Sequence, residues 1–204
     1  MQKAITGAIL AGDLNRRFNG QPKAFIEING QTIIERLYRL FKELFAEVII
    51  VTNRPALFTD FGCLIATDLF PARASLTGIH AGLFYARHDH LFVSACDTPF
   101  LKKGLVKVIC DAAHLPGGVT MPVTATGQEP LCALYTKKCL PLMEKHIALN
   151  QLKIRSVFGK KWLHEISERR LRQADRDLIS FYNINRPEDM ERAKRLVGDG
   201  EVSP

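Results

Sequence analysis

The chain has 204 residues, 47% of them hydrophobic, and a formal net charge of +7 at pH 7. Such a chain can bury the core of one α/β domain, which argues against a disordered or fibrous protein. No segment reaches the roughly 20 apolar residues of a membrane-spanning helix, so no membrane partner is expected, and the positive charge favours an anionic partner. We expect a single domain over residues 1–197 and a flexible tail over 198–204.

The N-terminus and the cysteines favour a cytoplasmic protein. The N-terminal apolar run is short and is followed by basic residues, so a first buried strand explains it better than a signal peptide does. The number of cysteines is odd, and no pair has the CxxC spacing of a zinc site, which favours reduced, buried thiols. The five cysteines are Cys63, Cys96, Cys110, Cys132 and Cys139.

Apolar runs alternate with helical patterns along the chain, which predicts an α/β fold with a mainly parallel sheet and helices on both faces. The strands expected in the first half are 4–10, 48–51, 63–66 and 91–96, and the helices are 31–45, 77–87 and 101–113. In the less regular second half we expect strands at 119–123, 131–135 and 178–184 and helices at 140–149 and 187–196.

Polar residues follow four of the expected strands. They are the loop after Leu10, then Asn53, Asp68 and Asp97. Ligands of open α/β sheets bind outside the carboxyl ends of the strands. We therefore expect these residues to converge on one cleft.

The loop LAGDLNRRFNGQPK, from Leu10 to Lys23, combines small residues with basic ones. Small residues let backbone N–H groups approach phosphate oxygens, and Arg16, Arg17 and Lys23 could neutralise a triphosphate. The loop has neither the GxxxxGK[ST] order nor the GxGxxG order. From these residues alone, phosphate binding and a solvated basic loop both stay open.

Two carboxylates after strands have a functional and a structural interpretation. Asp97, in VSACDTPF, could hold Mg²⁺, which favours oxygen ligands, or it could cap the helix expected from Leu101. Asp68 could face the ligand or simply end its strand in a turn. The sequence HDH at 88–90 lies where a polar turn belongs, and no further ligand stands near it, so we do not expect a metal there.

Five segments, in order, resemble the motifs of the molybdenum cofactor guanylyltransferases. They are the first loop, 67–79 (TDLFPARASLTGI), 95–100 (ACDTPF), 128–135 (QEPLCALY) and 181–189 (FYNINRPED). The resemblance implies a Rossmann-like nucleotidyltransferase fold. It also implies transfer of GMP from GTP to molybdopterin, with release of pyrophosphate.

The resemblance implies a role for particular residues. The catalytic residues would be Lys23, Arg17 and Asp97, and Asp97 would bind the cofactor Mg²⁺. Asn183 or Asn185 would approach the metal side of the cleft. The nucleotide-binding residues would be Leu10, Ala11, Gly12, Lys23, Asn53, Asp68 and Asp97.

Three other functions stay open. One is a cytidylyltransferase of the same cofactor, and another is a sugar-phosphate nucleotidyltransferase of the same fold. The third is a non-catalytic nucleotide- or cofactor-binding protein. Its support is that the chain departs from the family motifs at Asp13, Ala74 and Ser75.

The expected partners are GTP and molybdopterin, with transient contact to other cofactor-biosynthesis or acceptor proteins. A basic stretch, Arg169 to Arg176, could be a solvated helix face, a docking site for anionic molybdopterin or a protein, or a nucleic-acid contact. No nucleic-acid motif supports the last of these, so no nucleic-acid partner is expected.

Overall fold

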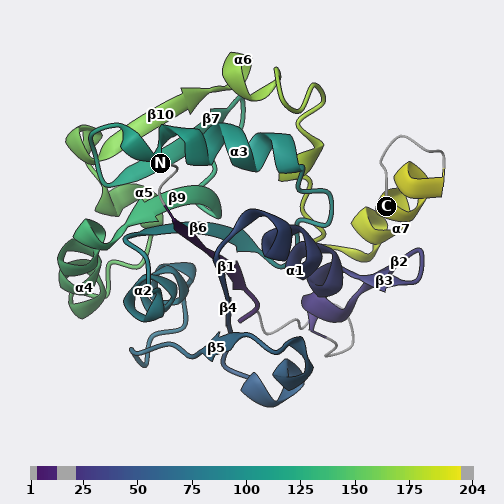
Figure 1. Cartoon of the computed structure of the whole chain (residues 1–204), viewed down its shortest axis with the longest axis horizontal. Helices are drawn as coiled ribbons and strands as arrows, with labels where there is room; N and C mark the ends of the chain where they lie inside the picture. The colour runs from purple at the N-terminus through teal and green to yellow at the C-terminus, as the bar shows by residue number, and fades with distance from the viewer. Residues whose placement is uncertain (1–3, 13–21, 199–204) are drawn as a thin grey trace.

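The computed structural model describes residues 4–12 and 22–198, and the main sheet of these residues has eight strands (Figure 1). Their order is β10-β7-β9-β6-β1-β4-β5, with β8 paired to β7. The strands are β1 (Ile5–Leu10), β4 (Glu47–Val51), β5 (Leu64–Ala66), β6 (His90–Ala95), β7 (Val119–Thr124), β8 (Gly127–Gln128), β9 (Cys132–Thr136) and β10 (Leu163–Ser167). Strand β9 runs antiparallel to β6 and β7, and β8 runs antiparallel to β7. The other pairings are parallel, which confirms the prediction of a mainly parallel sheet.

Helices cover both faces of the sheet, as the alternating pattern predicts (Figure 1). Helices α1 (Ile33–Leu44) and α3 (Lys103–Asp111) pack on one face, and α2 (Ser75–Tyr85) and α4 (Leu140–Ala148) pack on the other. The second half of the described chain also contains α5 (Ile154–Val157), α6 (Glu168–Leu171) and α7 (Pro187–Gly198).

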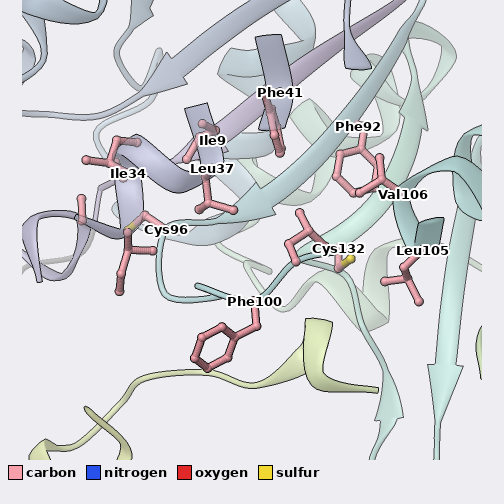
Figure 2. Packing of buried hydrophobic residues seen from close by; sticks show 14 of the residues in the cluster. Ile9, Ile34, Leu37, Phe41, Phe92, Cys96, Phe100, Leu105, Val106 and Cys132 are labelled. Atoms are coloured by element: carbon pink, nitrogen blue, oxygen red, sulfur yellow. The ribbon is translucent and has the colours of Figure 1, made fainter. Parts of the chain in front are cut away.

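The central strands are buried on both faces, which divides the core into two clusters. In β1, Ile9 faces the cluster under α1 and α3, whereas Ala8 faces the cluster under α2 and α4. On the first face, Phe41 of α1 packs against Phe92 of β6 with ring centroids 5.8 Å apart (Figure 2). A continuous apolar run is what a strand with two buried faces requires.

A hairpin and a helix cap hold the segment that carries Lys23. Strands β2 (Glu27–Ile28) and β3 (Gln31–Thr32) are joined by Asn29 and Gly30, whose φ angles of 51° and 75° suit a tight two-residue turn. Thr32 and Glu35 then form a capping box at the start of α1. Because the backbone N–H of Ile33 also donates to the carbonyl of Ile26 (3.0 Å), the 3₁₀ turn Lys23–Phe25 is fixed against α1.

The strand predicted at 178–184 is wrong. This segment begins with Leu178 in the left-handed region (φ 54°) and forms the 3₁₀ turn Ile179–Phe181. Its apolar side chains pack against the core, which explains the strand-like pattern. Its backbone, however, bonds elsewhere: the N–H of Ser180 donates to a carboxylate oxygen of Asp175 (2.8 Å), and the N–H of Ile184 donates to the carbonyl of Asp97 (2.9 Å).

Strand β10 (Leu163–Ser167) was not predicted. It pairs with β7 along one side, and among its five residues only Ile166 is buried. A strand with one neighbour and polar side chains has little of the apolar signal that marks central strands. The predicted helices and the other strands are present, with ends shifted by a few residues.

The five cysteines are free thiols. Burial raises the pKa of Cys110 to about 12 and that of Cys139 to about 11, so both thiols stay protonated near neutral pH. Helix α7 ends at Gly198, and the rest of the expected tail lies outside the described residues. No helix in the described part of the chain is long and apolar enough to cross a membrane.

Candidate active site

A cleft of about 460 Å³ opens at the carboxyl ends of β1, β4, β5 and β6. The loop residues Leu10 and Gly12 line it together with Asn53, Asp68 and Asp97, so the polar residues after the four strands converge as predicted. The full lining is Leu10, Gly12, Lys23, Val51, Thr52, Asn53, Asp68, Arg73, Ala74, Ser75, Gly78, Ala95, Cys96, Asp97, Leu131 and Asn185.

One part of the cleft is formed by the loops after β4 and β5. The side-chain amide of Asn53 donates to a carboxylate oxygen of Asp68 (2.8 Å), and the N–H of Asp68 donates back to the amide oxygen of Asn53 (3.4 Å). The pair lies at the surface, where its polar atoms can exchange partners. Such an amide and carboxylate can bind the hydroxyl and N–H groups of a nucleoside.

Ala11 differs from the other predicted binding residues because it is not part of the cleft lining. Its N–H donates to the carbonyl of Val51 (2.8 Å), and its carbonyl accepts the hydroxyl of Thr52 (3.0 Å). These bonds tie the start of the first loop to the end of β4. Ala11 therefore holds Leu10 and Gly12 in place rather than facing the cleft.

The other part of the cleft centres on Lys23. Its ammonium donates to Asp97 Oδ2 (3.3 Å) and to Asn185 Oδ1 (2.8 Å). The lysine is 7% exposed and the aspartate side chain 19% exposed. Three segments that are distant in the chain thus bring two oxygen atoms around one cation.

Hydrogen bonds outside the cleft link the loop after Asp97 to the segment before Asn185. Asp175, whose side chain is fully buried, accepts the N–H of Ser180 (2.8 Å) and pairs with the ammonium of Lys102 (3.0 Å). The hydroxyl of Ser180 accepts the N–H of Lys102 (3.0 Å). This network joins the loop that follows Asp97 to the segment that leads to Asn185.

Asp189, in the first turn of α7, fixes the backbone at Asn185. Its carboxylate accepts the N–H groups of Asn185 (2.9 Å) and Arg186 (2.8 Å). An acidic residue in the first turn is the sequence signal for such a cap. The resemblance pointed to Asn183 or Asn185, and the structure places Asn185 in the cleft.

Sequence reasoning missed two residues near the cleft. Arg73 lines it from the loop before α2, and a basic residue between Asp68 and a predicted helix could have signalled it. Asp175 gave no local signal, because an isolated aspartate in a polar stretch is usually exposed. Arg17, predicted to be catalytic, lies outside the described residues.

Asp97 and Asn185 are the residues near Lys23 whose oxygen atoms could hold a divalent hard cation. Asp97 and Asn185 present a carboxylate and an amide oxygen to a position that an ammonium now occupies. The described residues hold no cluster of three or more His, Cys, Asp or Glu suited to a metal. Mg²⁺ commonly binds through one or two carboxylates together with substrate phosphates, and Asp97 can serve in this way.

The basic stretch after β10 bonds largely to its own neighbours. Arg172 pairs with Glu168 (2.9 Å) and donates to the carbonyl of Arg176 (2.6 Å). Arg170 donates to the side-chain oxygen of Gln173 (2.6 Å). These contacts are those of an exposed helical turn.

The fold and the cleft together define an α/β nucleotidyltransferase. A nucleotidyl transferase from Methanothermobacter superposes with a TM-score of 0.70 over 94% of this chain and 96% of its own, at 17% identity, which supports the fold alone. The chain belongs to the family of the MobA-like NTP transferase domain, whose model matches residues 7–168.

Two relatives are similar over almost their whole length. The molybdenum cofactor guanylyltransferase of Desulfosudis oleivorans is 43% identical over 200 residues, which are 98% of this chain and 99% of the relative. The crystal structure of molybdopterin-guanine dinucleotide biosynthesis protein A from Archaeoglobus fulgidus has a TM-score of 0.85 and 25% identity, covering 95% of this chain and 99% of its own. The family that the sequence motifs resemble is therefore confirmed.

Proposed function

We propose that this protein transfers GMP from GTP to molybdopterin, forming molybdopterin guanine dinucleotide and releasing pyrophosphate. The observation that carries the proposal is the 43% identity, over nearly the whole chain, to a molybdenum cofactor guanylyltransferase. The cleft is consistent with it, because a polar pair suited to a nucleoside and a cation–carboxylate pair suited to phosphates open into the same space.

The reaction is a displacement at phosphorus. A terminal phosphate oxygen of molybdopterin forms a bond to the α-phosphorus of GTP, and the bond from that phosphorus to the bridging oxygen of the β-phosphate breaks. The electron pair leaves with pyrophosphate. The protein needs no covalent intermediate, since alignment and charge neutralisation supply the catalysis.

Each part of the cleft has a role in this scheme. Asn53 and Asp68 hold the nucleoside, and the backbone at Leu10 and Gly12 follows the phosphates. Lys23 turns from Asp97 toward the triphosphate and stabilises the departing pyrophosphate. Arg17 is proposed to act beside it.

Asp97 would hold Mg²⁺, with Asn185 near enough to assist. The metal, when bound, would draw negative charge from the α-phosphate. Because Lys23 now bonds to the same two side chains, the lysine and the metal would share Asp97 or exchange at it. The proposed setting is the cytoplasm, with transient transfer of the product to acceptor proteins.

The decisive experiment is a set of incubations with molybdenum-loaded molybdopterin, Mg²⁺ and each nucleoside triphosphate in turn, followed by mass measurement of the product. The proposal expects a mass increase of one GMP with GTP only. A CMP adduct would support the cytidylyltransferase, and nucleotide binding without product or pyrophosphate would support the non-catalytic protein. Omission of the metal tests the Mg²⁺ requirement.

A further inference from the structure

Arg73 is a cation of the cleft that the proposed reaction leaves without a role. It lines the cleft two residues before α2 begins, and its side chain is exposed. Within residues 4–12 and 22–198, its guanidinium has no hydrogen bond or ion pair. An arginine side chain carries a positive charge near neutral pH whatever its surroundings.

The acidic groups that line the cleft have other partners. The carboxylate of Asp68 accepts the amide of Asn53 (2.8 Å), and the carboxylate of Asp97 accepts the ammonium of Lys23 (3.3 Å). In this structure Lys23 is thus paired with a carboxylate that it must leave to meet a phosphate, whereas the guanidinium of Arg73 has no such partner among the described residues. A nucleoside triphosphate brings several negative charges, more than a single lysine can balance.

The start of α2 lies close to the phosphate-facing loop. Gly78, in its first turn, faces both Leu10 and Asp68, since an added Cβ would lie 3.6 Å from Leu10 Cδ2 and 3.9 Å from Asp68 Oδ1. The helix therefore runs directly over the end of β1. Arg73, at the entrance to this helix, is within the same cleft as the loop that follows Leu10.

We propose that Arg73 binds the phosphate chain of the nucleotide as a second cation of the same cleft, in addition to Lys23. The proposal rests on the proposed function in that the ligand is a nucleoside triphosphate. The planar guanidinium can bind two phosphate oxygens at once, which fixes the direction of the chain as well as its charge.

The test compares binding of GTP and of guanosine, which lacks phosphates, to the purified full-length chain. Arg73→Ala should weaken GTP binding by roughly 10- to 100-fold, the usual cost of losing a hydrogen bond to a charged group. Guanosine binding should stay unchanged. Arg73→Lys keeps the charge and loses the bidentate geometry, so its affinity for GTP should lie between those of the wild type and Arg73→Ala. The loss should shrink as salt is raised.

The matched control is Arg54→Ala. Arg54 is exposed and follows Asn53 directly, but it does not line the cleft. This variant removes the same charge from the same neighbourhood and should leave GTP binding within about twofold, because Arg54 does not line the cleft and only a screened, long-range charge is lost. Thermal unfolding of each variant shows that the fold is intact.

Three outcomes overturn the proposal: unchanged GTP binding in Arg73→Ala, an equal loss for GTP and guanosine, or an equal loss in the Arg54 control. The proposed function fails differently, when the wild type prefers another triphosphate. The comparison is then repeated with that triphosphate and its nucleoside, and the same outcomes decide the role of Arg73. A wild type that binds no triphosphate overturns both.

Discussion

The chain builds the two polar groups of the cleft in different ways. Asn53 and Asp68 are 15 positions apart, follow neighbouring parallel strands and meet at the surface. Lys23 lies 74 positions from Asp97 and 162 positions from Asn185, and its ammonium is buried between them. The first group follows from two strands alone, whereas the second requires the whole sheet and the C-terminal segment.

This difference separates recognition from chemistry. A hydrogen bond at the surface contributes only about 1 kcal/mol, so the Asn53–Asp68 pair can open when a nucleoside arrives. Groups that stabilise a reaction must be held in position before it occurs. Asp97 is held in this way, because its carbonyl accepts the N–H of Ile184 and its carboxylate pairs with Lys23. We therefore expect substitutions beside Lys23 to affect turnover and substitutions at the surface pair to affect affinity.

The largest effect is expected for Asp97→Ala. The variant loses the carboxylate proposed for the metal and the ionic partner of Lys23, so turnover at saturating GTP should fall by about 10³-fold. The measurement is the rate of pyrophosphate release, with thermal unfolding as the control for the fold. A folded variant that retains near-normal turnover would contradict the role of Asp97.

Lys23→Ala should slow transfer, as expected for this part of the cleft, and should also weaken GTP binding by roughly 50-fold, because a charge-assisted bond to phosphate is lost. GMP should lose less affinity, since it lacks the outer phosphates. Competition binding of the two nucleotides to the wild type and the variant measures both effects. Equal losses for GTP and GMP would show that the lysine acts elsewhere.

Asp175→Ala tests whether the Lys23 side of the cleft depends on its supporting network. The variant leaves Lys102 and the N–H of Ser180 without their carboxylate, and we expect a loss of about 2 kcal/mol in the free energy of unfolding. Denaturant titration measures this value.

The control for Asp175→Ala is Glu43→Ala. It breaks the exposed pair of Glu43 and Lys103 (3.0 Å) and should cost less than about 1 kcal/mol. If the two variants lost the same free energy of unfolding, the buried Asp175 network would stabilise the fold no more than an exposed ion pair does.

The sequence was sufficient where the signal is local. The strands that end at Leu10, Val51, Ala66 and Ala95 are marked by apolar runs. The polar residues that follow these strands in the sequence line the cleft. These signals need no knowledge of distant contacts, which is why both the sheet and the convergence of Asn53 and Asp68 on one cleft could be anticipated.

The sequence was insufficient where distant groups satisfy the backbone. The segment 178–184 has apolar side chains like a strand, but Asp175 and Asp97 bind its backbone instead of a neighbouring strand. Arg73 stands between Asp68 and a predicted helix, but whether its side chain lines the cleft depends on how α2 crosses the end of β1. The hydrophobic pattern of a sequence indicates which side chains are buried. It does not indicate which backbone groups form hydrogen bonds with one another.

The smallest effect is expected for Asn53→Ala, which removes the amide that bonds to Asp68. If the pair holds the nucleoside, the affinities for GTP, GMP and guanosine should all fall by the same factor, about two- to tenfold for one exposed hydrogen bond. Turnover at saturating GTP should be unchanged, since the phosphates keep their contacts. Gln151→Ala, at an exposed residue outside the cleft, should have no effect on any of the three. A loss confined to GTP would move Asn53 to the phosphate side, and a fall in turnover would end the separation of recognition from chemistry on which the comparison rests.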